Sequence, residues 1–303
     1  MIRIFGTVLA GLLGLAFGSF LNVCLSRWPE GQSIVKPRSH CRNCSRTLTW
    51  WENLPILSWL ALSGRCRTCN AEISWRYPAV ELALCVLWAF TAWRVIPAML
   101  SPDLSPTQGP LNFLYSSGLD LALGRMLLYW LLIALAMLDA ESLWLPNWIT
   151  IPGIALGILL NCAHFVLADW LAEGPNIGLP GTFAVSLLGE SVAPIAAAAL
   201  ILLIRWTYWL IRRREGIGLG DAKLMALLGA WLGLSGALLS FGIGVVLGAL
   251  FATIALALPA ARRESNAWLT AKLPLGTFLC IGGIISALWG PPIIDAYKRW
   301  AGF

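Results

Sequence analysis

The chain has 303 residues, of which 58% are hydrophobic and only 12% are charged. Soluble domains carry about 25% charged residues, so at a mean hydropathy of +0.76 too few polar side chains are present to cover a water-soluble globule. The composition excludes that class and predicts an all-α polytopic integral membrane protein. The net charge of +6 could indicate nucleic-acid binding. In a membrane protein, however, an excess of Lys and Arg indicates first which loops face the cytoplasm, so we expect no nucleic-acid partner.

Charge-poor runs that can cross about 30 Å of hydrocarbon locate the membrane spans. They are Ile4–Ser26, Tyr77–Met99, Leu121–Leu138, Ile149–Ala168, Ser191–Ile211, Leu224–Ala261 and Leu275–Ile294. As a single helix, Leu224–Ala261 would overshoot the bilayer nearly twofold. We therefore divide it near residues 233–236, which predicts about eight transmembrane helices.

The distribution of Lys and Arg predicts which segments face inward. With the N-terminus outside, 16 of the 21 Lys and Arg residues fall on the inner side, a strong positive-inside signal. Both termini are then outside. The predicted domains are 1–26, a first transmembrane helix; 27–76, a cytoplasmic domain; and 77–303, a transmembrane domain.

Four of the eight cysteines form two Cys-x-x-Cys pairs on the inward-facing segment. The pairs are Cys41 with Cys44 and Cys66 with Cys69, and 21 residues separate them. This spacing can supply four thiolates to one tetrahedral Zn²⁺. Two disulfides are the alternative, but disulfides do not persist in a reducing compartment. The prediction is a structural zinc site.

Two aspartates fall at the inner membrane face although acids are scarce in this chain. Asp139 ends one predicted span, and Asp221 opens another after Gly218-Leu-Gly220. Ionisable groups at membrane depth indicate function. Two adjacent carboxylates cannot both ionise readily, so one can keep a proton while the other activates water, as in an aspartic protease. Alternatively, both are ordinary interfacial charges, with Lys223 as the partner of Asp221.

An ordered set of segments resembles the bacterial type IV prepilin peptidases, a family of GxGD aspartic peptidases. The set comprises residues 17–29, 36–41, 51–60, 64–66 and 76–82, Leu138-Asp139 with Pro146, the Gly218-Leu-Gly220-Asp221 motif, and residues 273–276. The resemblance runs over nearly the whole chain. It departs from the family pattern at Asn147, where Asp is frequent. The family also often has a second acid two residues after the first catalytic aspartate, and here that acid is Glu141.

The resemblance implies two activities in the bacterial inner membrane. One is cleavage of the leader from type IV prepilins or type II secretion pseudopilins, by Asp139 and Asp221, at the cytoplasmic face. The other is N-methylation of the new N-terminal residue with S-adenosylmethionine, associated with the zinc domain. The implied partners are these substrates and membrane lipids, and both termini are periplasmic. No glycine-rich fingerprint identifies residues that bind the methyl donor.

Two other classes of protein would use the same residues differently. In a transporter or channel, Asp139 and Asp221 would relay protons or cations. In a scaffold protein of the secretion machinery, the zinc loop would be a docking module. A transporter is expected to show acids deeper in its spans and broken helices in repeated positions, and the sequence shows neither.

Overall fold

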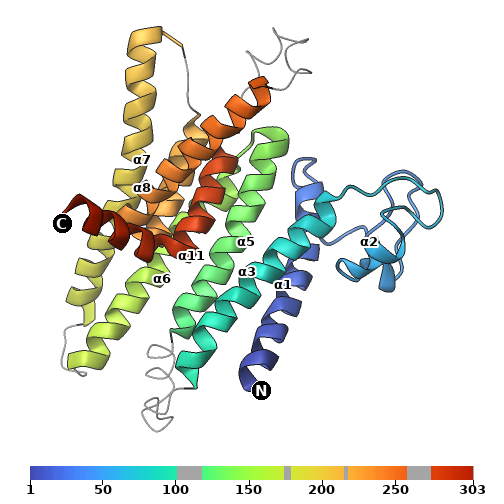
Figure 1. The fold of residues 1–303 in the computed structure, drawn as a ribbon, viewed down its shortest axis with the longest axis horizontal. Coiled ribbons are helices and arrows are strands. Elements are labelled where there is room, and N and C mark those ends of the chain that lie inside the picture. Colours follow the sequence, from blue (N-terminus) through green and yellow to red (C-terminus); the bar gives the residue numbers. More distant parts are fainter. Residues whose placement is uncertain (101–117, 174–178, 215–217, 258–273, 303) are drawn as a thin grey trace. The chain divides into compact units, whose positions relative to one another are not determined.

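The computed structural model describes residues 1–100, 118–173, 179–214, 218–257 and 274–302, and within them every regular element is a helix (Figure 1). Seven of the described helices are long and apolar enough to cross a membrane. The prediction of an all-α membrane protein is thereby confirmed. The chain separates into two compact units, Met1–Ala134 and Leu135–Phe303. The boundary between them lies inside α5 (Leu119–Ser142), and the predicted domains 1–26, 27–76 and 77–303 stay a prediction.

Unit 1 is built on the close pairing of α1 (Ile2–Arg27) with α3 (Arg76–Met99). A Cβ atom on Gly14 would lie 2.6 Å from the carbonyl oxygen of Leu84, and one on Gly18 would lie 2.7 Å from Cα of Glu81. Without glycine at these positions the two helices would have to separate. Small residues allow this approach of helix backbones, as is usual in membranes.

Between α1 and α3 the chain forms the cysteine loop, residues 28–75. It contains the short 3-10 helix η1 (Trp51–Asn53) and the single-turn helix α2 (Leu57–Ala61). Buried polar contacts tie the loop to the helices: the carboxylate of Glu81 on α3 accepts the backbone N–H of Ile56 at 2.7 Å. On α1, the buried Arg27 donates to the carbonyl of Ser33 in the loop at 2.8 Å.

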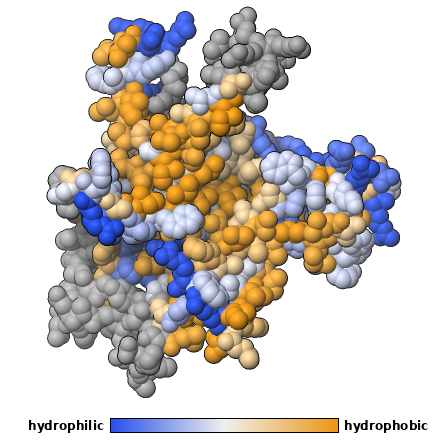
Figure 2. Space-filling model, in the orientation of Figure 1, coloured by the Kyte–Doolittle hydropathy of each residue, from blue (hydrophilic) through white to orange (hydrophobic). Residues whose placement is uncertain are grey.

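Unit 2 holds α6 (Asn147–Glu173), α7 (Leu179–Arg212), α8 (Leu219–Ala257) and α11 (Leu275–Ala301). Helix α8 packs against the other three. Large apolar side chains point outward along the described helices, as the extensive apolar surface in Figure 2 shows. In water such a surface would aggregate, whereas in a bilayer it contacts lipid.

Gly233 breaks α8 into two helical parts, which confirms the predicted division of the long apolar run. Its backbone has φ 69° and ψ 177°, and both ends of α8 lie toward the same end of unit 2 in Figure 1. Just before the break, the carbonyl of Ala230 accepts the side-chain N–H of Asn161 at 2.8 Å. The first part, residues 219–232, is about 21 Å long. The run was predicted to end at Ala261, and residues 258–261 lie outside the described part of the chain.

Candidate functional site

The two cysteine pairs sit in turns of the same backbone design. In each turn the first cysteine donates its N–H to the carbonyl five residues later, Cys41 to Arg46 at 2.9 Å and Cys66 to Ala71 at 2.8 Å. In each, the residue after the second cysteine has a positive φ, 56° at Ser45 and 54° at Asn70. These tight turns direct both thiols of a pair to the same side.

The four thiols of these turns form one cluster. All four sulfur atoms lie within 4.8 Å of one another, and Sγ of Cys41 is 3.8 Å from Sγ of Cys69. Four Zn–S bonds of about 2.3 Å in a tetrahedron also place the sulfurs about 3.8 Å apart. The cluster can therefore hold a metal ion.

Backbone amides prepare two of the thiols for the thiolate form. The N–H of Cys69, followed by that of Thr68, lowers the pKa of Cys66 to about 6. The N–H of Ala71 likewise lowers the pKa of Cys69. At Cys44 the N–H of Arg46 has the same tendency, but burial and hydrogen bonds with the other three cysteines prevail and raise its pKa to about 11. A bound cation would displace the proton of Cys44.

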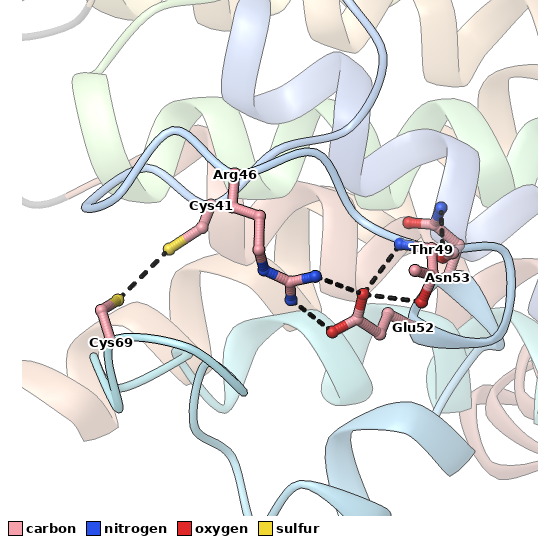
Figure 3. A network of polar contacts seen from close by, with 6 residues as sticks. All are labelled: Cys41, Arg46, Thr49, Glu52, Asn53 and Cys69. Carbon is pink, nitrogen blue, oxygen red and sulfur yellow. Dashed lines mark hydrogen bonds and ion pairs between the residues drawn. The ribbon is translucent and has the colours of Figure 1, made fainter.

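A buried ion pair lies beside the cluster (Figure 3). The Arg46 guanidinium contacts both carboxylate oxygens of Glu52, at 2.5 and 3.2 Å, and Thr49 donates to the same carboxylate from its N–H at 2.8 Å and its hydroxyl at 2.7 Å. Hydrogen bonding by Arg46 lowers the pKa of Glu52 to about 2. The charge of Cys66 also acts on Arg46, so the ion pair is coupled electrostatically to one thiol of the cluster.

Asp139 lies in unit 2, in the last turns of α5, where it is buried with 5% of its surface exposed. Its Oδ2 accepts the backbone N–H of Thr277 at 2.7 Å and the Thr277 hydroxyl at 3.1 Å. Thr277 belongs to the first turn of α11. Glu141 is exposed and, two positions further along the same helix, faces away from Asp139.

Asp221 lies in the first turn of α8, also in unit 2, where its Oδ2 accepts the backbone N–H of Gly218 at 3.2 Å. The charge of Asp139 acts on Asp221, and both charges act on the fully buried Cys280 of α11. The two predicted aspartates are thus brought into one neighbourhood although they are far apart in sequence. Lys223, considered as a partner for Asp221, donates to Oδ1 of Asn147 at 2.6 Å.

Sequence reasoning missed the side chains that surround the predicted residues. Thr277 follows directly on the 273–276 segment that carries part of the family resemblance, so its position was the available signal. Arg46 flanks the second cysteine of a pair, where a positive charge favours thiolates, and Glu52 lies in the 51–60 segment of the resemblance. Their pairing had no signal, because it depends on how the turn folds back onto η1.

Comparison with known proteins places both units in one family. Residues 12–95 match the model of the bacterial peptidase A24 N-terminal domain, and residues 126–253 match the model of the type IV leader peptidase family. No solved structure matches the chain.

Curated relatives cover the chain almost completely. The prepilin leader peptidase/N-methyltransferase of Stutzerimonas stutzeri is 31% identical over 96% of this chain and 93% of its own length. The protein of that name from Pseudomonas aeruginosa has the same values, and the one from Aeromonas hydrophila is 34% identical over 95% of this chain and 91% of its own. The chain therefore belongs to the type IV leader peptidase family.

Proposed function

We propose that the chain is a membrane aspartic endopeptidase with a second, methyltransferase activity. It cleaves the leader from type IV prepilins or type II secretion pseudopilins and N-methylates the newly exposed residue. The observation that carries the proposal is the gathering of the buried Asp139, from α5, and the half-buried Asp221, from α8, into one neighbourhood of unit 2. Membership of the family and the names of the curated relatives support the same pair of activities.

In the proposed cleavage, the carboxylates of Asp139 and Asp221 share one proton. The ionised carboxylate removes a proton from water as the water attacks the scissile carbonyl, and the protonated one donates to the departing amine. The products are a leader ending in a carboxyl group and a mature chain with a free amino group. Each aspartate lies within a turn or two of the end of its helix, so the reaction needs no access from the middle of the bilayer.

The proposed orientation follows from the positive-inside distribution of Lys and Arg. The chain crosses the bacterial inner membrane several times, with both termini periplasmic. The cysteine loop and the aspartates then face the cytoplasm. In that orientation the basic leader of a prepilin, which remains on the cytoplasmic side, meets the carboxylates directly.

Cys41, Cys44, Cys66 and Cys69 would hold one structural Zn²⁺. The close grouping of the four sulfurs supports this, and so does the lack of any other core. Throughout residues 28–75, all of which the structure describes, Cys66 is the only buried apolar side chain. A loop of this kind depends on a metal for its fold. S-adenosylmethionine is the proposed methyl donor, and no residue of the described chain is assigned to it.

The deciding experiment is cleavage of a purified prepilin by the purified protein in detergent. We expect cleavage by the wild type and none by Asp139→Asn or Asp221→Asn, with both variants inserted and folded. Glu141→Gln should retain most of the activity, because its side chain faces away from the pair. A transporter or scaffold would not cleave at all, and full cleavage by either Asn variant would refute the assignment of the two aspartates.

A further inference from the structure

The N-terminal turn of α11 forms a cradle for the carboxylate of Asp139. Thr277 donates to Oδ2 twice, from its backbone at 2.7 Å and from its hydroxyl at 3.1 Å. Gly276, one residue earlier, lies directly against this carboxyl group. Free N–H groups at a helix N-terminus are well suited to hold a carboxylate.

The contact at Gly276 leaves no space for a side chain. A Cβ atom there would lie 2.9 Å from both Cγ and Oδ2 of Asp139. The backbone of α11 and the carboxyl group of α5 are therefore in direct contact, and Gly276 is what allows the amide of Thr277 to reach Oδ2.

The Thr277 hydroxyl has two acceptors, and both lie on α5. Besides Oδ2 of Asp139, it contacts the backbone carbonyl of Ala136 at 3.1 Å. The Thr277 hydroxyl thus hydrogen-bonds both the side chain of Asp139 and the backbone of the helix that carries it. Asp221 differs: its hydrogen bond among the described residues is a single, longer one of 3.2 Å to Gly218.

We propose that Thr277 is a positioning residue for peptide cleavage. Its hydroxyl fixes the rotamer of Asp139 with Oδ2 engaged, so that Oδ1 faces the reaction. Carboxylates in catalysis must be held within about 0.5 Å of the productive geometry. Loss of one hydrogen bond to a charged group changes the equilibrium between its held and released positions about 10- to 100-fold. The inference rests on the proposed function, in which Asp139 is one of the two catalytic carboxylates.

The test compares Thr277→Val with Thr277→Ser in cleavage of a purified prepilin. Valine keeps the shape and the backbone N–H but removes the hydroxyl, whereas serine keeps the hydroxyl. We expect Thr277→Val to lower kcat about 10- to 100-fold with KM changed less than about twofold, and Thr277→Ser to restore at least about half of the wild-type kcat. Methylation of a substrate that has already been cleaved should be unchanged in both variants.

Thr253→Val is the matched control, because among the residues that the structure describes the Thr253 hydroxyl hydrogen-bonds only the carbonyl of Leu250 on its own helix, α8, at 2.8 Å. It should cleave like the wild type. If Thr277→Val does not fold, Thr277→Ala replaces it, with the same expected loss of kcat and the same rescue by serine.

Three results separate the two proposals. Wild-type kcat in a folded Thr277→Val enzyme would overturn the role of the hydroxyl. Equal losses in the folded valine and serine variants would overturn it too, since the loss would then follow packing. Cleavage by Asp139→Asn would instead overturn the proposed function itself, whatever Thr277 does.

Discussion

Two ion pairs of the cysteine loop differ sharply in their exposure. In the Arg42–Glu30 pair the side chains are 63% and 52% exposed and their charged atoms are 3.8 Å apart. In the Arg46–Glu52 pair the Glu52 side chain is 1% exposed and its contact with Arg46 is 2.5 Å. Exposed pairs contribute little, because water and salt screen them. The buried pair is the one that can hold a neighbouring thiolate in place.

We expect Glu52→Gln to accelerate the loss of zinc from the purified enzyme to a chelator by about 10-fold or more, as is typical when the outer partners of metal ligands are removed. Glu30→Gln, in the exposed pair, should release zinc at the wild-type rate. The measurement is the rate of zinc transfer to a coloured chelator. Equal rates for the two variants would mean that Arg46 holds the cluster without help from Glu52.

The pKa of Glu52 fixes the pH range of this effect. Because the folded-state pKa is lowered to about 2 from an ordinary 4.5, the contribution of the charged carboxylate is complete above about pH 4.5 and declines as the pH falls toward 2. The ratio between the zinc-release rates of Glu52→Gln and the wild type should therefore be the same at pH 8 and pH 6. A ratio that approached one at pH 6 would contradict the assignment.

At the scale of elements, the break in α8 depends on one residue that accepts a left-handed backbone. A side chain at φ 69° is strained even where space is open, and nothing lies within 4 Å of a Cβ on Gly233. A polar side chain from a neighbouring helix compensates for the interrupted helix. Asn161 of α6 does so at the carbonyl of Ala230, one of the last carbonyls before the break, which lack a partner within the helix.

We expect Gly233→Ala to lower the free energy of unfolding by about 1 to 3 kcal/mol, the usual cost of a strained backbone conformation. Gly242→Ala is the matched control in the same helix. It also has nothing within 4 Å of its Cβ, but its φ is not in the left-handed region, so alanine should be neutral or slightly stabilising there. Unfolding by sodium dodecyl sulfate, followed by circular dichroism, measures both. Equal free energies of unfolding for the two variants would mean that the break in α8 does not need glycine.

The elements themselves were largely predictable from the sequence, for identifiable reasons. Six of the seven predicted apolar runs lie within described helices, and the seventh, Leu224–Ala261, does so up to Ala257. An apolar run of that length has no other stable state in a bilayer. The break at Gly233 followed from length alone, and the cysteine cluster followed from spacing. The Thr277–Asp139 and Arg46–Glu52 contacts could not be predicted, because hydrophobic periodicity and motif spacing do not define the side-chain packing that brings these residues together.

At the scale of the whole molecule, the predicted metal site and the predicted carboxylate pair belong to different units. No cysteine pair adjoins Asp139 or Asp221 in the sequence. Removing the metal should therefore disturb methylation more than cleavage. The variant is Cys66→Ser combined with Cys69→Ser, and Cys85→Ala on α3 is the control.

We expect the double variant to lose its zinc, as measured by elemental analysis, and to become sensitive to proteases within residues 28–75. It should keep most of its cleavage activity while methylation falls at least about 10-fold. Retained methylation with lost cleavage would reverse the proposed division of labour, and absence of zinc from the wild type would refute the site.

The short first part of α8 has a consequence for the surrounding lipid. At about 21 Å it is about 9 Å shorter than the hydrocarbon core, so its far end stops within the bilayer. Leu234 and Ser235 are exposed just after this end. Lipid adapts to such hydrophobic mismatch by thinning locally. The same part carries Asp221 at its start, so the thickness of the bilayer affects the position of Asp221 at the membrane surface. Cleavage should therefore depend on the acyl-chain length of the lipid.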